Sequence, residues 1–502
     1  MSDARRARRL EEQTSKTSED FADLDVERLF GSEAAEDESA DRLAEYFLKT
    51  EVWHSTTDLR RNLRIVVGKK GTGKSAIFRI ASREDEANGR LSIIVQPDDF
   101  HEIAIGEGDH LKLVRAWRKG LNQVILSKAL QSLSKGDPSA EGKGFKAAGK
   151  ILDVISRAVE GKLKGFSLDP ARQELAESFA AKRELTVYID DLDRGWIGSQ
   201  DDVRRLAAMF DAIRDLLRDN DTVRCRIALR SDVYTLLRTE PASDKFEASA
   251  VHQSWSNHEV FVLLIKRIET FFGREVDSER LLNLRQRELA GFLDPIVERR
   301  FHGAGKWSDT QTYHVILSFA RRRPRDLVKL LTFAAREAQR QKHSRILTAD
   351  LQGVFPQFSD GRLQDVVNEF KAELPALRDI LLAMKPSKQE RAAVDSYVLS
   401  TEQMVRKLQN VLGGVSARFT DGRQMTPVNL LAFLYKIDFL QARKDDGDEI
   451  QRVYFDENSR ITPDQVDVGF KWEIHLAFRW VLQPDRPEDI YRFTDPELSE
   501  AG

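Results

Sequence analysis

One stretch of the sequence, GKKGTGKS at 68–75, limits the possible folds more than any other. It matches G-x-x-x-x-G-K-[ST] at every fixed position. It lies between an apolar run at 63–67 and a segment that carries Ile77, Phe78 and Ile80 at helical spacing. A glycine-rich turn between a buried strand and a helix presents successive backbone N–H groups to phosphate oxygens. The pattern predicts a phosphate-binding loop between a strand and a helix of an α/β protein.

The loop residues have distinct predicted roles. Lys74 supplies a positive charge to the outer phosphates, and Ser75 offers a hydroxyl to Mg²⁺. The glycines let the backbone aim its N–H groups inward. A chance match in a turn is the alternative, and the flanking strand and helix argue against it. The residues expected to contact the nucleotide are Gly68, Lys69, Lys70, Gly71, Thr72, Gly73, Lys74, Ser75 and Ala76.

A second stretch, VYIDDLDRGW at 187–196, places three carboxylates directly after a short apolar run. Carboxylates this close repel one another and lose solvation when buried, and a metal ion would offset both costs. Asp190 is predicted to hold Mg²⁺ through a coordinated water, and Asp191 to orient or deprotonate the attacking water. Asp193 and Arg194 could pair with each other, reach a neighbouring subunit or cap the next segment. A solvated acidic loop is the alternative for the whole stretch.

Composition limits the remaining classes. The chain has 502 residues, is 41% apolar and 32% charged, and has a net charge of −3, so no global field attracts it to nucleic acid or membrane. A single cysteine, Cys225, excludes a disulfide framework and a multi-cysteine zinc site. No apolar run approaches the roughly 20 residues of a membrane span, and the N-terminus lacks the apolar core of a secretion signal. We expect a cytoplasmic protein.

VVGKKGTGKSA and VYIDDLDRGW together resemble the KAP-like branch of P-loop ATPases, within the wider AAA+ and STAND-type group. The likeness is greatest to bacterial ATPases often found near mobile-element and phage-defence genes. Three further stretches resemble the helix before the loop, a sensor-like strand end and a lid helix with a sensor arginine. They are AEYFLKTEVW (44–53), IALRSDVYTLL (227–237) and RRRPRDLVKLL (321–331). The resemblance covers residues 28–370.

The resemblance implies a central parallel sheet in which another strand separates the loop strand from the acid strand. The expected order, 5-1-4-3-2, runs through the apolar segments centred on residues 251, 65, 227, 187 and 93.

The resemblance also implies an arginine near the phosphates. Arg230 or Ser231, at the end of the strand at 225–229, could sense the γ-phosphate. Arg325, beside Pro324, could reach the nucleotide from the lid or act in trans as an arginine finger. Arg321, Arg322 and Arg323 lie beside it, so which of these arginines acts stays open. An ordinary surface arginine, for Arg230, and a basic helix start facing solvent, for Arg325, are the alternatives.

Four parts are expected along the chain. They are a disordered or helical tail at 1–27, a P-loop ATPase core at 28–258, a helical lid at 259–385 and a winged-helix-like α+β domain at 386–502.

The last part contains helices near 401–412 and 427–436, a hairpin with the tip KDDGDE, a strand FKWEI and a helix at 475–482. From 390 to 502 there are 14 Lys and Arg against 20 Asp and Glu, a net −6. An acidic tip would be repelled by phosphates, so this domain favours protein contact or oligomer packing over DNA. We expect His475 and Trp472 to be core or interface residues.

The basic residues are concentrated elsewhere. Nucleic acid could bind along the stretch of residues 321–345. The other interpretation is a nucleotide lid whose helix carries mixed salt bridges. The basic residues of the stretch are Arg321, Arg322, Arg323, Arg325, Lys329, Arg336, Arg340, Lys342 and Arg345.

ATP is the expected nucleotide, because the chain has no N-K-x-D motif for guanine and no LSGGQ-like signature. We interpret the chain as an ATP-dependent switch that uses Mg²⁺, hydrolyses ATP slowly, and forms a homo-oligomer or signals to a partner protein. A phage-defence setting is implied by the resemblance alone. The alternatives are a DNA-engaged loader or remodeller and a catalytically weak scaffold with a structural nucleotide.

Overall fold

The computed structural model describes residues 21–33, 35–100, 109–135, 184–194, 196–219, 222–238, 244–275, 277–392, 396–446, 449–458, 470–482 and 490. The chain divides into two compact units. The inserted unit comprises residues 49–253. The flanking unit comprises the residues up to Leu48 and those from Ser254 onward. Along the described residues, no helix is both long enough and apolar enough to span a bilayer.

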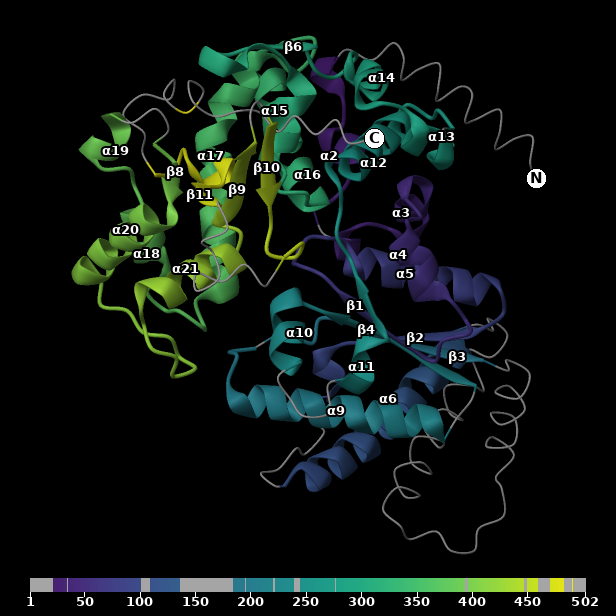
Figure 1. The fold of residues 1–502 in the computed structure, drawn as a ribbon. Coiled ribbons are helices and arrows are strands. Elements are labelled where there is room, and N and C mark those ends of the chain that lie inside the picture. Colours follow the sequence, from purple (N-terminus) through teal and green to yellow (C-terminus); the bar gives the residue numbers. More distant parts are fainter. Residues whose placement is uncertain are drawn as a thin grey trace, which may run out of the picture. The chain divides into compact units, whose positions relative to one another are not determined.

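A five-stranded parallel sheet forms the centre of the inserted unit (Figure 1). Its order is β2-β3-β4-β1-β5, which confirms the predicted order 5-1-4-3-2. Most side chains of β1, β2, β3 and β4 are buried, as in a parallel sheet that is covered on both faces, whereas β5 at the edge is only partly buried. The strands are β1 (Leu63–Val67), β2 (Leu91–Val95), β3 (Leu185–Ile189), β4 (Val223–Leu229) and β5 (Ala250–His252).

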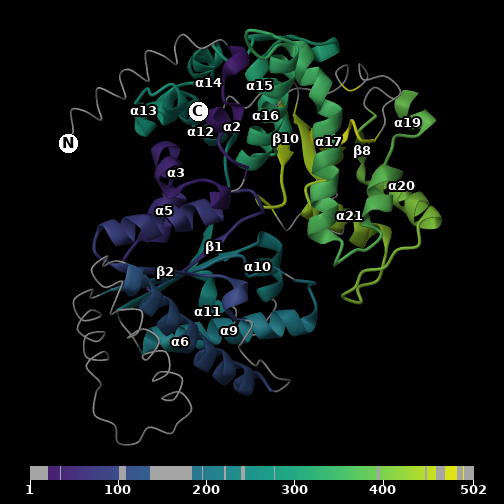
Figure 2. The ribbon, with the colours of Figure 1, turned by 180° about the vertical axis from the view of Figure 1, so that it is seen from behind.

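Helices cover both faces of this sheet. In Figures 1 and 2, α5 lies on one face and α6 and α9 lie on the other. Ser199 and Asp202 form the capping box that begins α9. The helical segments are α4 (Glu51–Thr57), α5 (Lys74–Ala87), η3 (Pro97–Phe100), α6 (His110–Lys135), α9 (Gln200–Arg218), α10 (Ser231–Leu237) and α11 (Asp244–Glu247).

Helices make up most of the flanking unit. Helix α3 ends at Tyr46, within the stretch AEYFLKTEVW, and Pro324 is the first residue of α16, a position that proline favours. The helical segments before residue 375 are η1 (Phe21–Asp23), α2 (Val26–Phe30), η2 (Ala35–Asp37), α3 (Ala40–Tyr46), α12 (Asn257–Phe271), α13 (Ser278–Asn283), α14 (Gln286–Leu289), η5 (Ala290–Leu293), η6 (Gly305–Trp307), α15 (Thr312–Phe319), α16 (Pro324–Arg340) and α17 (Thr348–Phe370).

The N-terminal part of the flanking unit packs on its later helices. Helix α2 contacts α12 and α16. The side chain of Lys266 donates to the main-chain oxygen of Phe47 at 2.6 Å, and Tyr46 Oη donates to Glu38 at 2.6 Å. Residues 1–20 of the expected tail lie outside the described residues.

A four-stranded sheet of order β10-β9-β11-β8 occupies the C-terminal part of the flanking unit. Helices α20 (Thr401–Gly414) and α21 (Pro427–Lys436) precede the hairpin of β9 (Leu440–Asp446) and β10 (Glu449–Val453), as expected. Their likeness to a winged helix stays a prediction. The remaining elements are α18 (Leu377–Ala383), α19 (Lys388–Ala392), β8 (Val398–Ser400), β11 (Lys471–Ile474) and η8 (Leu476–Phe478).

Two features of the flanking unit differ from expectation. Residues 259–385, expected to be helical, also contain a pair of short strands, because β6 (Arg300–His302) pairs with β7 (Ser308–Gln311). The last predicted helix, 475–482, is reduced to the three-residue turn η8. Strands of three or four residues are too short to show a period-2 pattern in the sequence.

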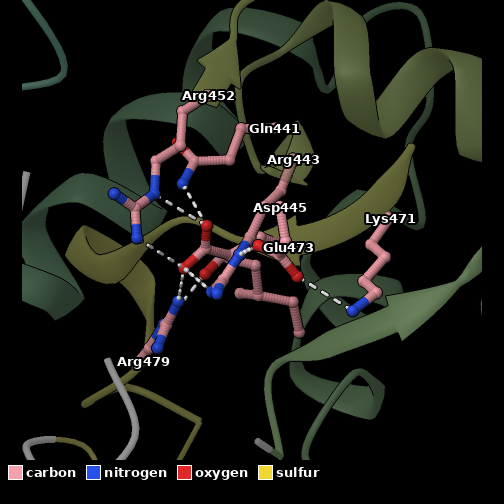
Figure 3. Close-up of polar contacts among 8 residues, drawn as sticks. Gln441, Arg443, Asp445, Arg452, Lys471, Glu473 and Arg479 are labelled. Carbon is pink, nitrogen blue, oxygen red and sulfur yellow. Dashed lines mark hydrogen bonds and ion pairs between the residues drawn. The ribbon is translucent and has the colours of Figure 1, made fainter. Parts of the chain in front are cut away.

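Glu473 on β11 is the centre of a buried ionic network in this sheet (Figure 3). It accepts hydrogen bonds from Arg452 at 2.8 Å, from Arg479 at 2.6 Å and from Gln441 at 2.9 Å. Arg443 lies directly across the strands from Arg452, and like charges in that position repel. Burial alone would raise the pKa of Glu473, but the charges of Arg452 and Arg479 hold it well below its usual range.

We expect Glu473→Gln to destabilise the flanking unit by about 3–5 kcal/mol, because it leaves buried arginines without their counter-charge. Asp445→Asn is the matched control. Asp445 pairs with Arg443 and Lys471, but its side chain is 30% exposed. The control should cost no more than about 1 kcal/mol. Urea unfolding measures both, and equal losses would contradict the assignment of Glu473 as the centre of the network.

Candidate functional site

The glycine-rich loop connects β1 to α5, as predicted. The N–H of Gly68 donates to the main-chain oxygen of Leu229 at 3.0 Å, which fixes the start of the loop against β4. Gly71 and Gly73 have φ angles of 82° and 92°, in the left-handed region that favours glycine. Gly73 is the N-cap of α5 and has no side chain to bond the first turn. Helix α5 therefore begins at the loop, and the first turn of a helix directs its N–H groups toward an anion.

Lys74 and Thr72 hold the loop in shape. The Lys74 ammonium donates to the main-chain oxygens of Gly68 at 2.8 Å and Lys69 at 3.0 Å. Thr72 Oγ1 donates to Lys69 O at 2.8 Å. The charge of Lys74 is thus held over the loop, the position required of a group that contacts the outer phosphates. Ser75 and Ala76 follow as the second and third residues of α5.

Asp190 follows β3 at the same edge of the sheet as the loop. Val67 pairs with Leu229, and Ile189 pairs with Ile227, so the carboxyl ends of β1, β4 and β3 are in register. Only β4 separates the two segments, which places their backbones about 10 Å apart. The side chain of Asp190 is buried. A buried carboxylate across from a phosphate-binding loop is the geometry that a shared Mg²⁺ needs.

Asp191 is held in a strained conformation. Its φ is 60°, in the left-handed region, where a Cβ is unfavourable. Its N–H donates to Asp190 Oδ1 at 2.9 Å, and Arg194 Nε donates to Asp191 Oδ2 at 3.0 Å. Arg194 also donates to Asp98 at 3.1 Å. Such strain is common at functional sites and persists where surrounding contacts over-determine the backbone.

Arg230 occupies the end of β4, between the loop and the acid strand. It is buried, and its Nε donates to Asp232 Oδ1 at 2.9 Å. Its Nη1 lies 3.5 Å from Asp193 Oδ2. Ser231 begins α10 beside it. These contacts tie the end of β4 to the loop after β3, and a sensing role for Arg230 or Ser231 stays a prediction.

Arg325 belongs to the flanking unit. It is the second residue of α16, and its Nε donates to the main-chain oxygen of Glu33 at 3.2 Å. Its action on the nucleotide, from the lid or in trans, stays a prediction.

The arginines before α16 form ion pairs within the flanking unit. Arg321 Nε donates to Asp326 at 2.6 Å, and Arg362 pairs with the same carboxylate. Burial would raise the pKa of Asp326, but Arg321 and Arg362 hold it well below its usual range. Arg323 Nη2 donates to Asp438 at 2.6 Å, in the loop before β9. These contacts favour the mixed salt-bridge interpretation of the basic stretch over a nucleic-acid track.

Gln253 also belongs to this site, although the sequence motifs do not predict it. It follows β5 and donates to the main-chain oxygen of Thr72 at 3.3 Å. Its position could have indicated this, because it directly follows the strand that ends at His252. The carboxyl ends of parallel strands are where such a sheet binds a ligand. The apolar segment centred on residue 251 indicates a strand and assigns no role to Gln253.

Comparisons with known proteins match different parts of the chain. A family model described as the FunZ-associated C-terminal helical domain matches residues 277–367, which is less than half of the chain. The "Putative transposon gamma-delta 80.3 kDa protein" of Escherichia coli (strain K12) is 23% identical over 394 residues. The match covers 71% of this chain and 53% of that protein, so the chain spans about half the length of this curated relative.

Several solved structures have a low level of similarity to this chain. The Aeropyrum pernix ORC1 protein in complex with DNA has a TM-score of 0.37 and 12% identity, and the match covers 88% of this chain and 94% of that chain. The ADP form of the Aeropyrum pernix ORC2 protein has a TM-score of 0.36 and 13% identity, with 93% and 95% covered. The Thermotoga maritima RuvB Holliday junction branch migration motor has a TM-score of 0.31 and 10% identity, with 68% and 81% covered. Similarity at this level does not establish a function.

The left-handed backbone at Asp191 makes a stability prediction. We expect Asp191→Gly to be more stable than Asp191→Ala by about 1 kcal/mol, because glycine removes the Cβ strain. Asp193 is the matched control, because its φ is not positive. There the alanine variant should be the more stable. Urea unfolding of the four variants checks the order, and alanine preferred at both positions would contradict the strain.

Proposed function

We propose that the chain binds ATP with Mg²⁺ at the loop of residues 68–76 and hydrolyses it slowly, as a nucleotide-dependent switch. The observation that carries this proposal is the parallel register of β1, β4 and β3. It brings a complete phosphate-binding motif and Asp190 to one edge of one sheet, with a single strand between them.

The residues at this edge fit a magnesium nucleotide. The uncapped first turn of α5 and the left-handed glycines match an anion, and the buried carboxylate of Asp190 matches a cation. Ser75 and Asp190 would hold Mg²⁺, which neutralises charge on the outer phosphates when it is bound. Lys74 exchanges the oxygens of Gly68 and Lys69 for phosphate oxygens.

Asp191 supplies the general base of the proposed reaction. Its carboxylate accepts a hydrogen bond from Arg194 and orients the attacking water. Aspartate reaches one methylene less far than the glutamate of many ATPases, which accords with slow turnover. Arg230 and Arg325 are the proposed arginines for sensing or for action in trans.

The setting we propose is a cytoplasmic ATPase of the KAP-like or STAND-type group, associated with mobile elements or phage defence. The name of the transposon gamma-delta relative supports the first setting. Nucleotide state would control self-association or contact with a partner protein through the flanking unit. We propose domain boundaries near residues 28, 259 and 386.

A DNA-engaged ATPase is the weaker candidate. Helix α21, at the place of a recognition helix, has buried apolar side chains, among them Leu430, Leu431 and Phe433. Its Lys436 pairs with Glu373 at 2.9 Å. A recognition helix would present polar side chains to a DNA groove. Adding duplex DNA should therefore leave the rate of ATP hydrolysis unchanged, whereas salt-sensitive stimulation would support the DNA-engaged alternative.

Substitutions separate binding from hydrolysis. We expect Lys74→Ala to abolish ATP binding, because it removes the positive charge over the loop. Asp191→Asn should keep binding and lower phosphate release by about 10²-fold or more. Calorimetry and a phosphate-release assay measure the two effects. Full ATP binding by Lys74→Ala would contradict the proposed site.

Mass photometry with and without ATP tests the switch. An unchanged mass together with unchanged partner binding would count against it.

A further inference from the structure

Gln253 contacts the phosphate-binding loop at two points. Its main-chain N–H donates to Val67 O at 2.7 Å, which continues the β5–β1 ladder by one residue. Its side-chain Nε2 donates to Thr72 O at 3.3 Å. Its main-chain oxygen lies 2.7 Å from the position that a Cβ on Gly68 would take, so glycine is needed for this close approach. One residue therefore holds both the start and the middle of the loop.

The side chain of Gln253 is buried and half-satisfied. It is 2% exposed, and its Oε1 has no hydrogen-bond partner among the described residues. A buried amide oxygen without a donor is unfavourable, and such groups in native structures are often functional. The amide is held on one side only, by the oxygen of Thr72. A change in the loop can therefore give it a different set of partners.

A bound nucleotide would change the part of the loop that Gln253 contacts. Lys74 donates to Gly68 O and Lys69 O here. Phosphate oxygens are charged and are stronger acceptors than main-chain oxygens, so a bound triphosphate draws the ammonium away from them. The backbone of residues 68–72 then exchanges partners, and Gln253 contacts both ends of that segment.

Gln253 is also the last residue of the inserted unit. Three residues later, Ser256 caps α12 in a reciprocal box with Glu259. Helix α12 is a buried element of the flanking unit, with Val260, Phe261 and Ile265 fully enclosed. Only two residues separate Gln253 from the capped start of this buried helix, so a displacement of Gln253 would act on that start.

We propose that Gln253 is a positioning residue that fixes the loop through Thr72 and links nucleotide occupancy to the start of α12. This inference rests on the proposed ATP site. It names the residue through which the occupied loop acts on the flanking unit.

Gln253→Met tests the inference, because methionine keeps the length of the side chain and removes the hydrogen bond. Gln286→Met is the matched control: Gln286 is a buried glutamine of the flanking unit, 8% exposed, and its Oε1 also has no hydrogen-bond partner among the described residues. Gln253→Glu is a second variant, which keeps the shape and places an acceptor against Thr72 O. Calorimetry with Mg-ATP and hydrogen exchange of residues 254–265, with and without Mg-ATP, are measured on the full chain.

We expect Gln253→Met and Gln253→Glu to weaken Mg-ATP binding by about 5- to 10-fold, the value of one hydrogen bond. Both should lose the nucleotide-induced protection of residues 254–265, and Gln286→Met should retain binding and protection. Wild-type binding and protection in both Gln253 variants would overturn the inference while leaving the ATP site intact. Failure of the wild-type chain to bind Mg-ATP would overturn the proposed function itself, and the inference with it.

Discussion

The parallel hydrogen-bond ladder of β1, β4 and β3 is the constraint on which the site depends. Strands in a parallel sheet deliver their carboxyl ends to one edge, and this register sets the loop after β1 opposite the acid after β3. A slip of one residue would turn the buried side chains of these strands to the opposite face.

The three carboxylates after β3 are tolerated because each has a defined place. Asp190 caps the end of the strand, Asp191 lies against Arg194, and Asp193 lies near Arg230.

Buried charge organises the flanking unit in a different way. Asp326 and Glu473 are each enclosed by arginines, in two networks that involve α16, α17 and the C-terminal sheet. Removing one partner from such a network leaves a buried charge without compensation, which is costly. His475 shows the effect of the same environment on a neutral group. Burial, together with the charge of Arg321, lowers its pKa to about 3, so the imidazole is neutral in the folded chain at physiological pH.

Local patterns predicted the inserted unit well, because its strands are continuous apolar runs and its loop has a fixed spacing. The order of the strands came from family resemblance, since apolar runs alone do not specify neighbours. The partners of Arg321 and Arg323 could not be predicted from sequence. Their sequence indicates a basic helix start. In the structure Arg321 pairs with Asp326, and Arg323 pairs with Asp438, which lies 115 residues later in the chain. The contact between Gln253 and Thr72 could not be predicted for the same reason, because it spans 181 residues.

The most direct test of the account is the magnesium dependence of ATP affinity in Asp190→Asn, with Asp193→Asn as the control in the same loop. Calorimetry compares ATP binding in Mg²⁺ with binding in EDTA. The account predicts that Asp190→Asn loses about 10- to 100-fold of the gain in affinity that Mg²⁺ gives the wild type, while Asp193→Asn keeps it. An Asp190→Asn variant with the full magnesium gain would show that the loop and the acid strand do not share a metal ion.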